Sequence, residues 1–421
     1  MSIYLERYAF PPLGIAKKPL PNTEMIVVVP VFNEEYLLVA LESLFVCELP
    51  LCSVEVIIVI NEPENCEQSI SEQNTATYNQ AIEWINMHTK KGLVFYVKHI
   101  KLNKKHAGVG LARKAGMDEA TLRFELINNE KGIILCYDAD CTCDSNYLLE
   151  VYNRFSNNKL KGASINFEHK FDNLSPFEKE GIIQYELHLR YYINALRSIG
   201  YPHAFHTIGS SMAVRVDIYK KAGGMNKRKA GEDFHFLHKV IPYQNYEEIT
   251  STTIYPSARV SNRVPFGTGK AMGTWLNTNK KELLSYHPQI FKEIAELLKQ
   301  VPYHFNNKQI EKELNKLPQP VVEYLKSENY VDVLKSINRQ SNTINVFFTR
   351  WYAWFNGLKI LHLVHFLRDN YYPSIPITEA AIRLISTHME DSFAILKKYR
   401  TMDQNFKATQ INLTHLYSEF L

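Results

Sequence analysis

The sequence has few cysteines, little net charge and no long apolar run. Its six cysteines are irregularly spaced, which argues against a disulfide framework. Three of them, Cys136, Cys141 and Cys143, lie in one short segment but lack the spacing of a zinc site. We interpret the cysteines as small buried thiols of a reducing compartment. The net charge is only +4, so bulk charge gives no reason to expect nucleic-acid binding, and we expect none.

Segments for membrane insertion or export are also lacking. No stretch approaches the roughly 20 apolar residues of a membrane span, and the densest candidate, residues 346–367, is interrupted by polar residues that include Arg350 and Lys359. The first residues contain Glu6 and Arg7 and lack the apolar core of a signal peptide. We therefore expect a cytoplasmic protein, with the inner face of the membrane as the alternative.

What the chain does contain is the composition of a globular protein. It has 421 residues, of which 45% are hydrophobic and 22% are charged, enough for one large or two medium domains. Its first half alternates apolar runs, which predict strands, with helical patterns. The runs are 25–29, 54–60, 93–97 and 132–137, and the helical patterns are 34–45, 76–88 and 106–126. Strands that are apolar on both faces predict an α/β protein with a mostly parallel, Rossmann-like sheet and helices on both faces.

The pattern changes after residue 150. Residues 162–167 and 210–216 are typical of strands, and 176–199 of a long helix. Beyond about residue 275 nearly every segment has a helical pattern. We therefore predict a first domain over residues 1–274 and a helical C-terminal region over residues 275–421.

The most informative segment is GIILCYDADCT, residues 132–142. Its apolar strand ends on two acids one residue apart, Asp138 and Asp140. A buried strand of an open α/β sheet would carry both acids to the edge where active sites of such folds lie. Two aspartates can hold a hard divalent cation, which in turn holds phosphate oxygens. A structural role as a cap or turn explains one acid more easily than two.

Polar residues also follow the first two strands. The first ends at Val29-Pro30-Val31, and a loop with Asn33 and Glu34 leads into a helix. Backbone N–H groups and a polar side chain at such a place can bind a base or a ribose; the alternative is simple helix capping, with Asn33 near the cap. Asn61 follows the second strand at the same edge of the sheet.

Three further segments carry charges that suit a phosphorylated ligand. Arg113 lies in a run of small residues, where it can bind phosphate or hold an acid of the site. Glu232 and Asp233 begin a helix, where they complement its dipole or supply a general base. Arg259 and Arg263, four residues apart before a glycine-rich stretch, suit either a phosphate-facing loop or a solvated basic loop.

Together these segments resemble the family 2 glycosyltransferases, which have the GT-A fold. VVPVFNEE at 28–35 is similar to the opening strand and turn of that family, and GLARKAG at 110–116 to its Gly-x-Ala-Arg helix. DAD at 138–140 is similar to its D-x-D motif, and GED at 231–233 to its E-D motif. The order and approximate spacing agree over residues 23–270.

The resemblance implies a metal-dependent inverting glycosyltransferase. Such an enzyme moves a sugar from a nucleotide-diphosphate sugar to a hydroxyl of a glycan, a lipid or a small molecule. Asp233 would be the catalytic base with Glu232 beside it, and Asp140 would hold Mg²⁺ or Mn²⁺ on the diphosphate together with Asp138. The residues implied near the donor are Pro30, Asn33, Glu34, Asn61, Arg113, Asp138, Ala139, Arg259 and Arg263.

The chain departs from the family pattern in two places. Many members carry aspartate where this chain has Asn61, which weakens the assignment of base contacts there. Some members add a metal-bound histidine after the E-D motif, but here His235 and His238 are followed only by the distant His287. We expect Arg259 and Arg263 to share in neutralising the charge.

Two other functions fit part of the sequence. DADCT also matches the D-x-D-x-T pattern of haloacid-dehalogenase-like phosphatases, in which Asp138 would be the nucleophile. That motif usually lies near the start of its domain, whereas here three predicted strands precede it. The third possibility is a glycosyltransferase fold that binds sugar nucleotides without catalysis, which the presence of Asp138, Asp140 and Asp233 argues against.

The C-terminal region contains a dense aromatic segment over residues 347–355. It is too apolar for a helix with one apolar face, so a buried packing helix is the favoured interpretation. The alternative is peripheral contact with a membrane surface or with the acceptor, because aromatic residues beside Arg350 and Lys359 suit an interface.

Overall fold

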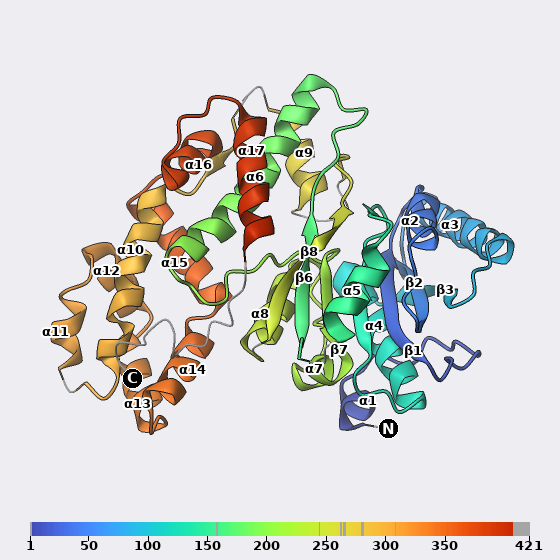
Figure 1. Cartoon of the computed structure of the whole chain (residues 1–421), viewed down its shortest axis with the longest axis horizontal. Coiled ribbons are helices and arrows are strands. Elements are labelled where there is room, and N and C mark those ends of the chain that lie inside the picture. The colour runs from blue at the N-terminus through green and yellow to red at the C-terminus, as the bar shows by residue number, and fades with distance from the viewer. Residues whose placement is uncertain are drawn as a thin grey trace. The chain divides into compact units, whose positions relative to one another are not determined.

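The computed structural model describes residues 2–156, 159–243, 245–261, 263, 267–278, 282–307 and 309–406 (Figure 1). The chain forms two compact units, each described here by itself. The first comprises Met1–Leu174 and Thr207–Asn277, and the second comprises Ser175–His206 and Thr278–Leu421. Residues 175–206 thus belong to the same compact unit as the C-terminal helices. The domain division at residue 275 stays a prediction.

The first unit is built on one sheet of eight strands among the described residues, in the order β3-β2-β1-β4-β7-β6-β8-β5. Its parallel part contains β1 (Thr23–Val31), β2 (Ser53–Pro63), β3 (Leu93–Leu102) and β4 (Ile133–Cys136). The remaining strands are β5 (Thr142–Cys143), β6 (Gly162–Phe167), β7 (Met212–Arg215) and β8 (Tyr246–Tyr255). β7 runs antiparallel to both β4 and β6, and β5 runs antiparallel to β8.

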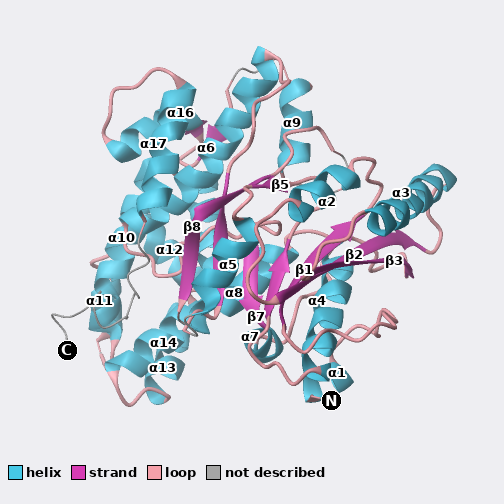
Figure 2. Ribbon diagram, turned by 45° about the vertical axis from the view of Figure 1, so that its right-hand side comes forward, coloured by secondary structure: helices cyan, strands magenta, loops and turns pink. Residues whose placement is uncertain are grey.

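Helices cover both faces of this sheet. The connections between the parallel strands are α2 (Leu37–Phe45), α3 (Gln68–Met87) and α4 (Val109–Leu126). Figure 2 shows α2 and α3 on one side of β1, β2 and β3, and α4 on the other. The remaining helices of the unit are α1 (Ile3–Arg7), α5 (Tyr147–Ser156), α7 (Val216–Lys221), α8 (Glu232–Val240), η1 (Ile241–Tyr243) and α9 (Thr268–Leu276). The predicted fold class is therefore confirmed.

The apolar runs explain why β1 and β2 form the centre of the sheet. Every residue of β1 except Glu24 is buried, as is every residue of β2 except Pro63. α3 begins eight residues before its predicted start at residue 76. Its first turns are polar, and two of the polar side chains, Asn74 and Thr77, are buried. The helix therefore has no apolar periodicity there from which its start could be predicted.

α4 packs closely on the sheet, and the chain before β1 packs on α4. A Cβ added at Gly116 would lie 2.4 Å from Cγ1 of Val28, so this crossing requires glycine. On α4 the buried Asp118 accepts hydrogen bonds from the Tyr4 hydroxyl (2.7 Å) and the Phe10 backbone N–H (2.6 Å). It also accepts one from Tyr219 (2.7 Å), so that one carboxylate joins three segments of the unit.

The second unit is helical apart from one short strand pair among its described residues. Its helices are α6 (Pro176–Ser198), α10 (Pro288–Gln300), η2 (Val301–His304), α11 (Ile310–Leu314), α12 (Gln319–Ser327), α13 (Tyr330–Arg339), α14 (Ile344–Trp354), α15 (Gly357–Asn370), α16 (Ile377–Ile385) and α17 (Ser392–Asn405). β9 (Leu284–Ser285) and β10 (Ile375–Pro376) pair antiparallel. Figure 1 shows α17 alongside α6. The buried Asp403 of α17 accepts hydrogen bonds from Arg190 (2.5 Å) and Arg197 (2.7 Å) of α6.

α14 carries most of the dense aromatic segment. Phe347, Phe348, Trp351 and Tyr352 are buried, and the Trp351 Nε1–H donates to the Tyr330 hydroxyl at 2.8 Å. This burial supports a packing helix. The expectation that the helix is apolar all round was wrong, because its other face is exposed, carries polar as well as apolar side chains and lines a surface groove. The groove residues are Asn345, Val346, Thr349, Arg350 and Ala353.

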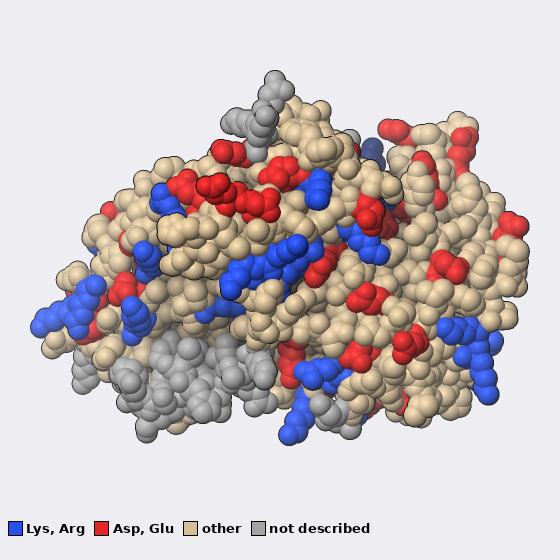
Figure 3. Space-filling view, turned by 45° about the horizontal axis from the view of Figure 1, so that its top comes forward, with Lys and Arg blue, Asp and Glu red and all other residues tan. Residues whose placement is uncertain are grey.

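Two properties of the whole chain complete the description. Among the described residues, no helix combines the length and the apolar character that crossing a membrane requires. On the face drawn in Figure 3, Lys and Arg side chains are interspersed with Asp and Glu side chains, in keeping with the small net charge.

The contact at Gly116 leads to a stability prediction. Gly116→Ala would place a methyl group against Val28, and we expect it to lower the free energy of unfolding by about 1–3 kcal/mol, measured by urea denaturation. Gly273→Ala in α9 is the matched control, because its new Cβ would meet only the half-exposed Val260, at 3.2 Å. There we expect no loss, since alanine favours helix. Equal losses in both variants would contradict the prediction.

Candidate active site

The predicted site residues gather at one edge of the sheet in the first unit. β1, β2 and β4 run parallel, so their carboxyl ends point the same way. The pairing of strand β1 with strand β4 ends at Val28 and Cys136, and beyond these residues the two segments are no longer paired. Polar loops leave from there, and ligands of open α/β sheets bind at such places. Pro30 and Ala139, both predicted near the donor, are buried at this edge.

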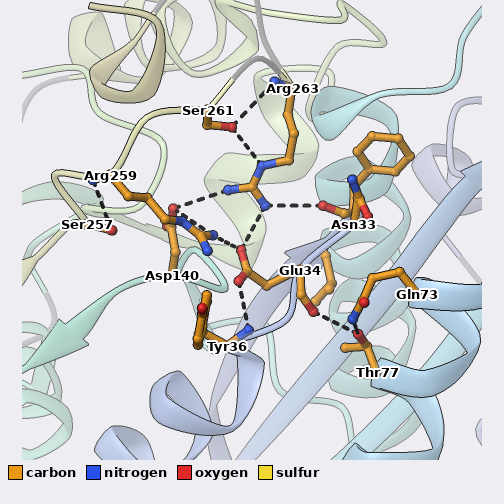
Figure 4. A network of polar contacts seen from close by, with 12 residues as sticks. Asn33, Glu34, Tyr36, Gln73, Thr77, Asp140, Ser257, Arg259, Ser261 and Arg263 are labelled. Carbon is orange, nitrogen blue, oxygen red and sulfur yellow. Dashed lines mark hydrogen bonds and ion pairs between the residues drawn. The ribbon is translucent and has the colours of Figure 1, made fainter. Parts of the chain in front are cut away.

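Glu34 and Asp140 share two arginines (Figure 4). The buried Glu34 carboxylate accepts hydrogen bonds from Arg259 and from Nη1 of Arg263, the latter at 2.8 Å. Asp140 Oδ2 lies 3.4 Å from Nη2 of Arg263 and 3.6 Å from Nη2 of Arg259. We call these four residues the arginine-pair cluster. The arginines of the predicted basic loop are therefore paired with acids, while their side chains stay partly exposed.

The pKa values of the two acids move in opposite directions. Burial alone would raise the pKa of Glu34, but hydrogen bonds from Arg259 and from the Tyr36 backbone N–H outweigh it and lower that pKa. For Asp140, burial and the nearby charge of Asp138 raise the pKa, and the two arginines oppose them. Glu34 therefore holds its negative charge more strongly than Asp140 when the pH falls.

The turn around Asn33 is held from α3. Asn33 has a positive φ of 48°, and its backbone N–H donates to Oδ1 of Asn74 at 2.9 Å. The Thr77 hydroxyl donates to the backbone carbonyl of Glu34 at 2.7 Å. Asn33 does not cap α2, whose N-cap residue is Tyr36, so the expectation that it lies near the cap was wrong. Asn74 and Thr77 were not predicted from the sequence, where no motif marks them.

Asn61 extends this support at the end of β2. Its Nδ2 donates to the backbone carbonyl of Val31 at 2.8 Å, which ties the ends of β1 and β2. Its Oδ1 is buried and has no hydrogen-bond donor within the described part of the chain. The neighbouring Glu62 is engaged by His99 (3.1 Å) and Lys101 (3.5 Å) and serves structure. One buried acceptor therefore remains at this edge.

A second cluster surrounds Arg113 of α4, whose guanidinium is buried. Its Nη2 donates to Asp138 (3.0 Å), its Nε to Glu232 (3.2 Å) and its Nη1 to the backbone carbonyl of Gly209 (2.9 Å). Burial alone would lower the pKa of Arg113, but the charges of Asp138 and Glu232 raise it well above the usual value. Gly209 was not predicted; a Cβ there would lie 2.7 Å from the guanidinium.

Asp233 borders this second cluster at the start of α8. The helix begins after Gly231, whose left-handed φ of 68° suits glycine. Burial and then the neighbouring charge of Glu232 raise the pKa of Asp233 to about 7, against the opposing charge of Arg113. A carboxylate with that pKa exists in both protonation states near neutral pH, as a general base requires.

The acids Asp138 and Asp140 therefore belong to different clusters, although one residue separates them. Each keeps part of its side chain exposed, 35% for Asp138 and 26% for Asp140. Among the described residues, no three His, Cys, Asp or Glu side chains group closely enough to enclose a metal ion. Two carboxylates are an incomplete donor set, so a Mg²⁺ or Mn²⁺ ion would need substrate phosphates and water as its other ligands.

Comparison with known proteins identifies the class of this site. Residues 26–223 match the model of glycosyl transferase family 2. No curated protein sequence matches the chain. Among solved structures, TarS 1–349 of S. aureus in complex with UDP-GlcNAc aligns with 14% identity and a TM-score of 0.41, covering 82% of this chain and 90% of that one. The same protein in complex with UDP aligns with 15% identity, a TM-score of 0.39 and the same coverage.

The chain therefore carries a family 2 glycosyltransferase domain, and the predicted resemblance is confirmed. The matched residues contain most of β1, all of α4 and β4 and the acidic pair, so three of the four motifs lie inside the match. The fourth, Gly231-Glu232-Asp233, lies beyond it and is joined to the others by Arg113. The matched segment is the domain of a glycosyltransferase.

The burial of Arg113 predicts a large effect on stability. Arg113→Met would leave Glu232 buried without its partner, and we expect the free energy of unfolding to fall by about 3–5 kcal/mol in urea denaturation. Adding Glu232→Gln should recover part of the loss because it removes the unpaired charge. If the single variant were as stable as the parent, the charges of this cluster would not hold the fold.

Proposed function

We propose that the protein transfers a sugar from a nucleotide-diphosphate sugar to a hydroxyl acceptor, with inversion at the anomeric carbon and with Mg²⁺ or Mn²⁺ on the diphosphate. One observation carries this proposal. In a family 2 domain, two partly exposed acids lie at the carboxyl edge of the sheet, and a third with a pKa of about 7 borders them. The acceptor, whether glycan, lipid or small molecule, a peripheral membrane contact and the cytoplasmic location stay predictions.

The nucleotide would bind where β1 and β2 end. The buried Oδ1 of Asn61 suits an N–H group of a base, because a buried acceptor without a donor costs about 1–3 kcal/mol. Pro30, Asn33 and Glu34 border the same place, so that backbone groups of the turn can contact the base or ribose. Asn74 and Thr77 fix that turn from α3, which leaves a preformed surface for the nucleotide.

The diphosphate would bind at the arginine-pair cluster. Arg259 and Arg263 can each donate to phosphate oxygens in place of carboxylates, since both anions accept the planar guanidinium in the same way. Asp140, with Asp138, would hold the cation, which neutralises charge on the departing diphosphate. A doubly charged anion and a divalent cation entering together would keep the net charge of the cluster unchanged.

Asp233 would take the proton of the acceptor hydroxyl. Glu232 and Arg113 touch each other and bias the charge of Asp233, so they act as positioning residues. A single displacement by an activated hydroxyl inverts the anomeric carbon, because attack is in line with the departing diphosphate. The phosphatase alternative needs Asp138 as a nucleophile, but its Oδ1 accepts the hydrogen bond of Arg113.

Asp140 provides the first test. Asp140→Ala should abolish sugar transfer and donor hydrolysis, assayed with a panel of nucleotide sugars, without loss of the folded circular dichroism spectrum. Calorimetry with UDP and GDP should show Mn²⁺-dependent binding in the parent and not in the variant. Glu35→Ala is the matched control, because Glu35 is exposed in the same turn as Glu34. A fully active Asp140→Ala protein would contradict the proposal, and tight donor binding without turnover in the parent would favour a binding protein.

The pKa of Asp233 provides the second test. A general base must be deprotonated, so kcat/KM should fall about tenfold per pH unit below a pKa near 7 and level off above it. Asp233→Asn should lose about 10²–10⁴-fold in transfer while binding the donor as before. The exposed Asp172, changed to Asn, is the control and should keep the parent profile. A profile without a step between about pH 6 and 8 would rule out Asp233 as the base.

A further inference from the structure

Two cysteine side chains meet beside the acidic motif. Cys47 follows the last turn of α2, and Cys143 is the last residue of β5. Their Sγ atoms are 3.7 Å apart, and both residues contact Ser43. The Cys47 thiol lies 3.2 Å from the backbone carbonyl of Ser43, and the Cys143 backbone N–H donates to the Ser43 hydroxyl at 2.9 Å. All six cysteines are free, and no part of the proposed mechanism uses these two.

The two thiols differ in exposure and in charge. Cys47 is buried, whereas Cys143 is half-buried, so the expectation that the cysteines are simply buried thiols was wrong for Cys143, as it was for Cys66. The hydrogen bond from Cys47 lowers the pKa of Cys143, and the Ser43 hydroxyl adds to this effect. The same hydrogen bond, together with burial, raises the pKa of Cys47. Cys143 is therefore the better nucleophile, with a buried second thiol beside it.

A small oxidant can approach Cys143, because this residue is half-buried and its neighbour Ser43 lies at the surface. Ser43, whose hydroxyl lies 3.5 Å from Sγ of Cys143, lines an open surface groove of about 460 Å³. The other groove residues are Leu38, Val39, Glu42, Val46 and Trp84. The remaining thiols differ, since Cys52, Cys136 and Cys141 are buried, and burial raises the pKa of each. Cys66 is half-buried in the loop after β2.

We propose that Cys143 and Cys47 form an oxidation site that hydrogen peroxide converts to a disulfide. The Cys143 thiolate attacks one peroxide oxygen, the O–O bond breaks, and a sulfenic acid and hydroxide form. The Cys47 sulfur then attacks the sulfenic sulfur, the S–S bond forms, and the oxygen leaves as water with the Cys47 proton. In total, two thiols are oxidised to one disulfide and one peroxide is reduced to two waters.

The disulfide would act on the candidate site through the two segments that it joins. A disulfide needs its sulfurs about 2.05 Å apart, so the present separation must close by about 1.7 Å. α2 begins just after Glu34, and β5 begins two residues after Asp140, so the bond would link the supports of both acids of the arginine-pair cluster. This consequence for activity rests on the proposed function, whereas formation of the bond does not.

Peptide mapping of the full chain tests the bond itself. After treatment with hydrogen peroxide and alkylation of free thiols, we expect the peptides of Cys47 and Cys143 to be joined, and to separate on reduction. In Cys47→Ser, dimedone should label Cys143 as its sulfenic acid, because the second thiol is missing. Cys66→Ser is the matched control and should form the disulfide like the parent. Oxidation of Cys66 or other cysteines with both Cys47 and Cys143 still free would overturn the proposal.

A second measurement tests the effect on the site. We expect peroxide to lower kcat/KM for sugar transfer at least tenfold, since a shift of about 1 Å at a site can cost about 100-fold, and dithiothreitol should restore it. Cys47→Ser should resist this disulfide-dependent loss, and Cys66→Ser should show it. A mapped disulfide with unchanged kcat/KM would overturn the link to the acidic motif. A protein without sugar transfer would refute the proposed function, while the mapping would still decide on the disulfide.

Discussion

The buried guanidinium of Arg113 is the interaction on which the site depends. A cation in a dry interior is stable only when anions and carbonyl oxygens surround it, because its hydration is lost. Arg113 meets this requirement with Asp138 after β4, Glu232 at the start of α8 and the carbonyl of Gly209 before β7. Three segments far apart in the sequence are thereby held at one point. Asp233 takes its position, and its raised pKa, from the same arrangement.

The two acids of the pair belong to two clusters, and we expect the two clusters to have different roles. Asp138 faces the buried arginine, and Asp140 faces two arginines from the loop after β8. Arg113 is fixed by burial, whereas Arg259 and Arg263 are partly exposed, with 30% and 25% of their side chains accessible. Because Arg113 is buried, the cluster around it suits a structural role. The accessible pair can exchange carboxylates for phosphates, because its ion pairs are already hydrated in part.

Much of the fold could be predicted because β1, β2 and β4 are apolar on both faces, a property that local sequence records directly. The D-x-D and E-D motifs could be found for a similar reason, since each lies within a few consecutive residues. Asn74, Thr77 and Gly209 could not, because their roles depend on which backbone groups the folded chain brings to them. The polar first turns of α3 were missed because the signal there is hydrogen bonding, not periodicity. The exposed face of α14 is different, because the buried Phe347, Phe348, Trp351 and Tyr352 do follow helical spacing, and the density of aromatic residues obscured it.

The two compact units are interleaved along the chain, and this affects how the protein folds during synthesis. The first unit is interrupted by residues 175–206, which group with helices that begin only after residue 278. A ribosome would therefore release α6 while the first unit still lacks β7, β8 and the acids of α8. Domains generally fold as units in the order of synthesis. The buried Arg190 of α6 therefore gains its ion pair with Asp403 only after α17, the last described helix, has been synthesised.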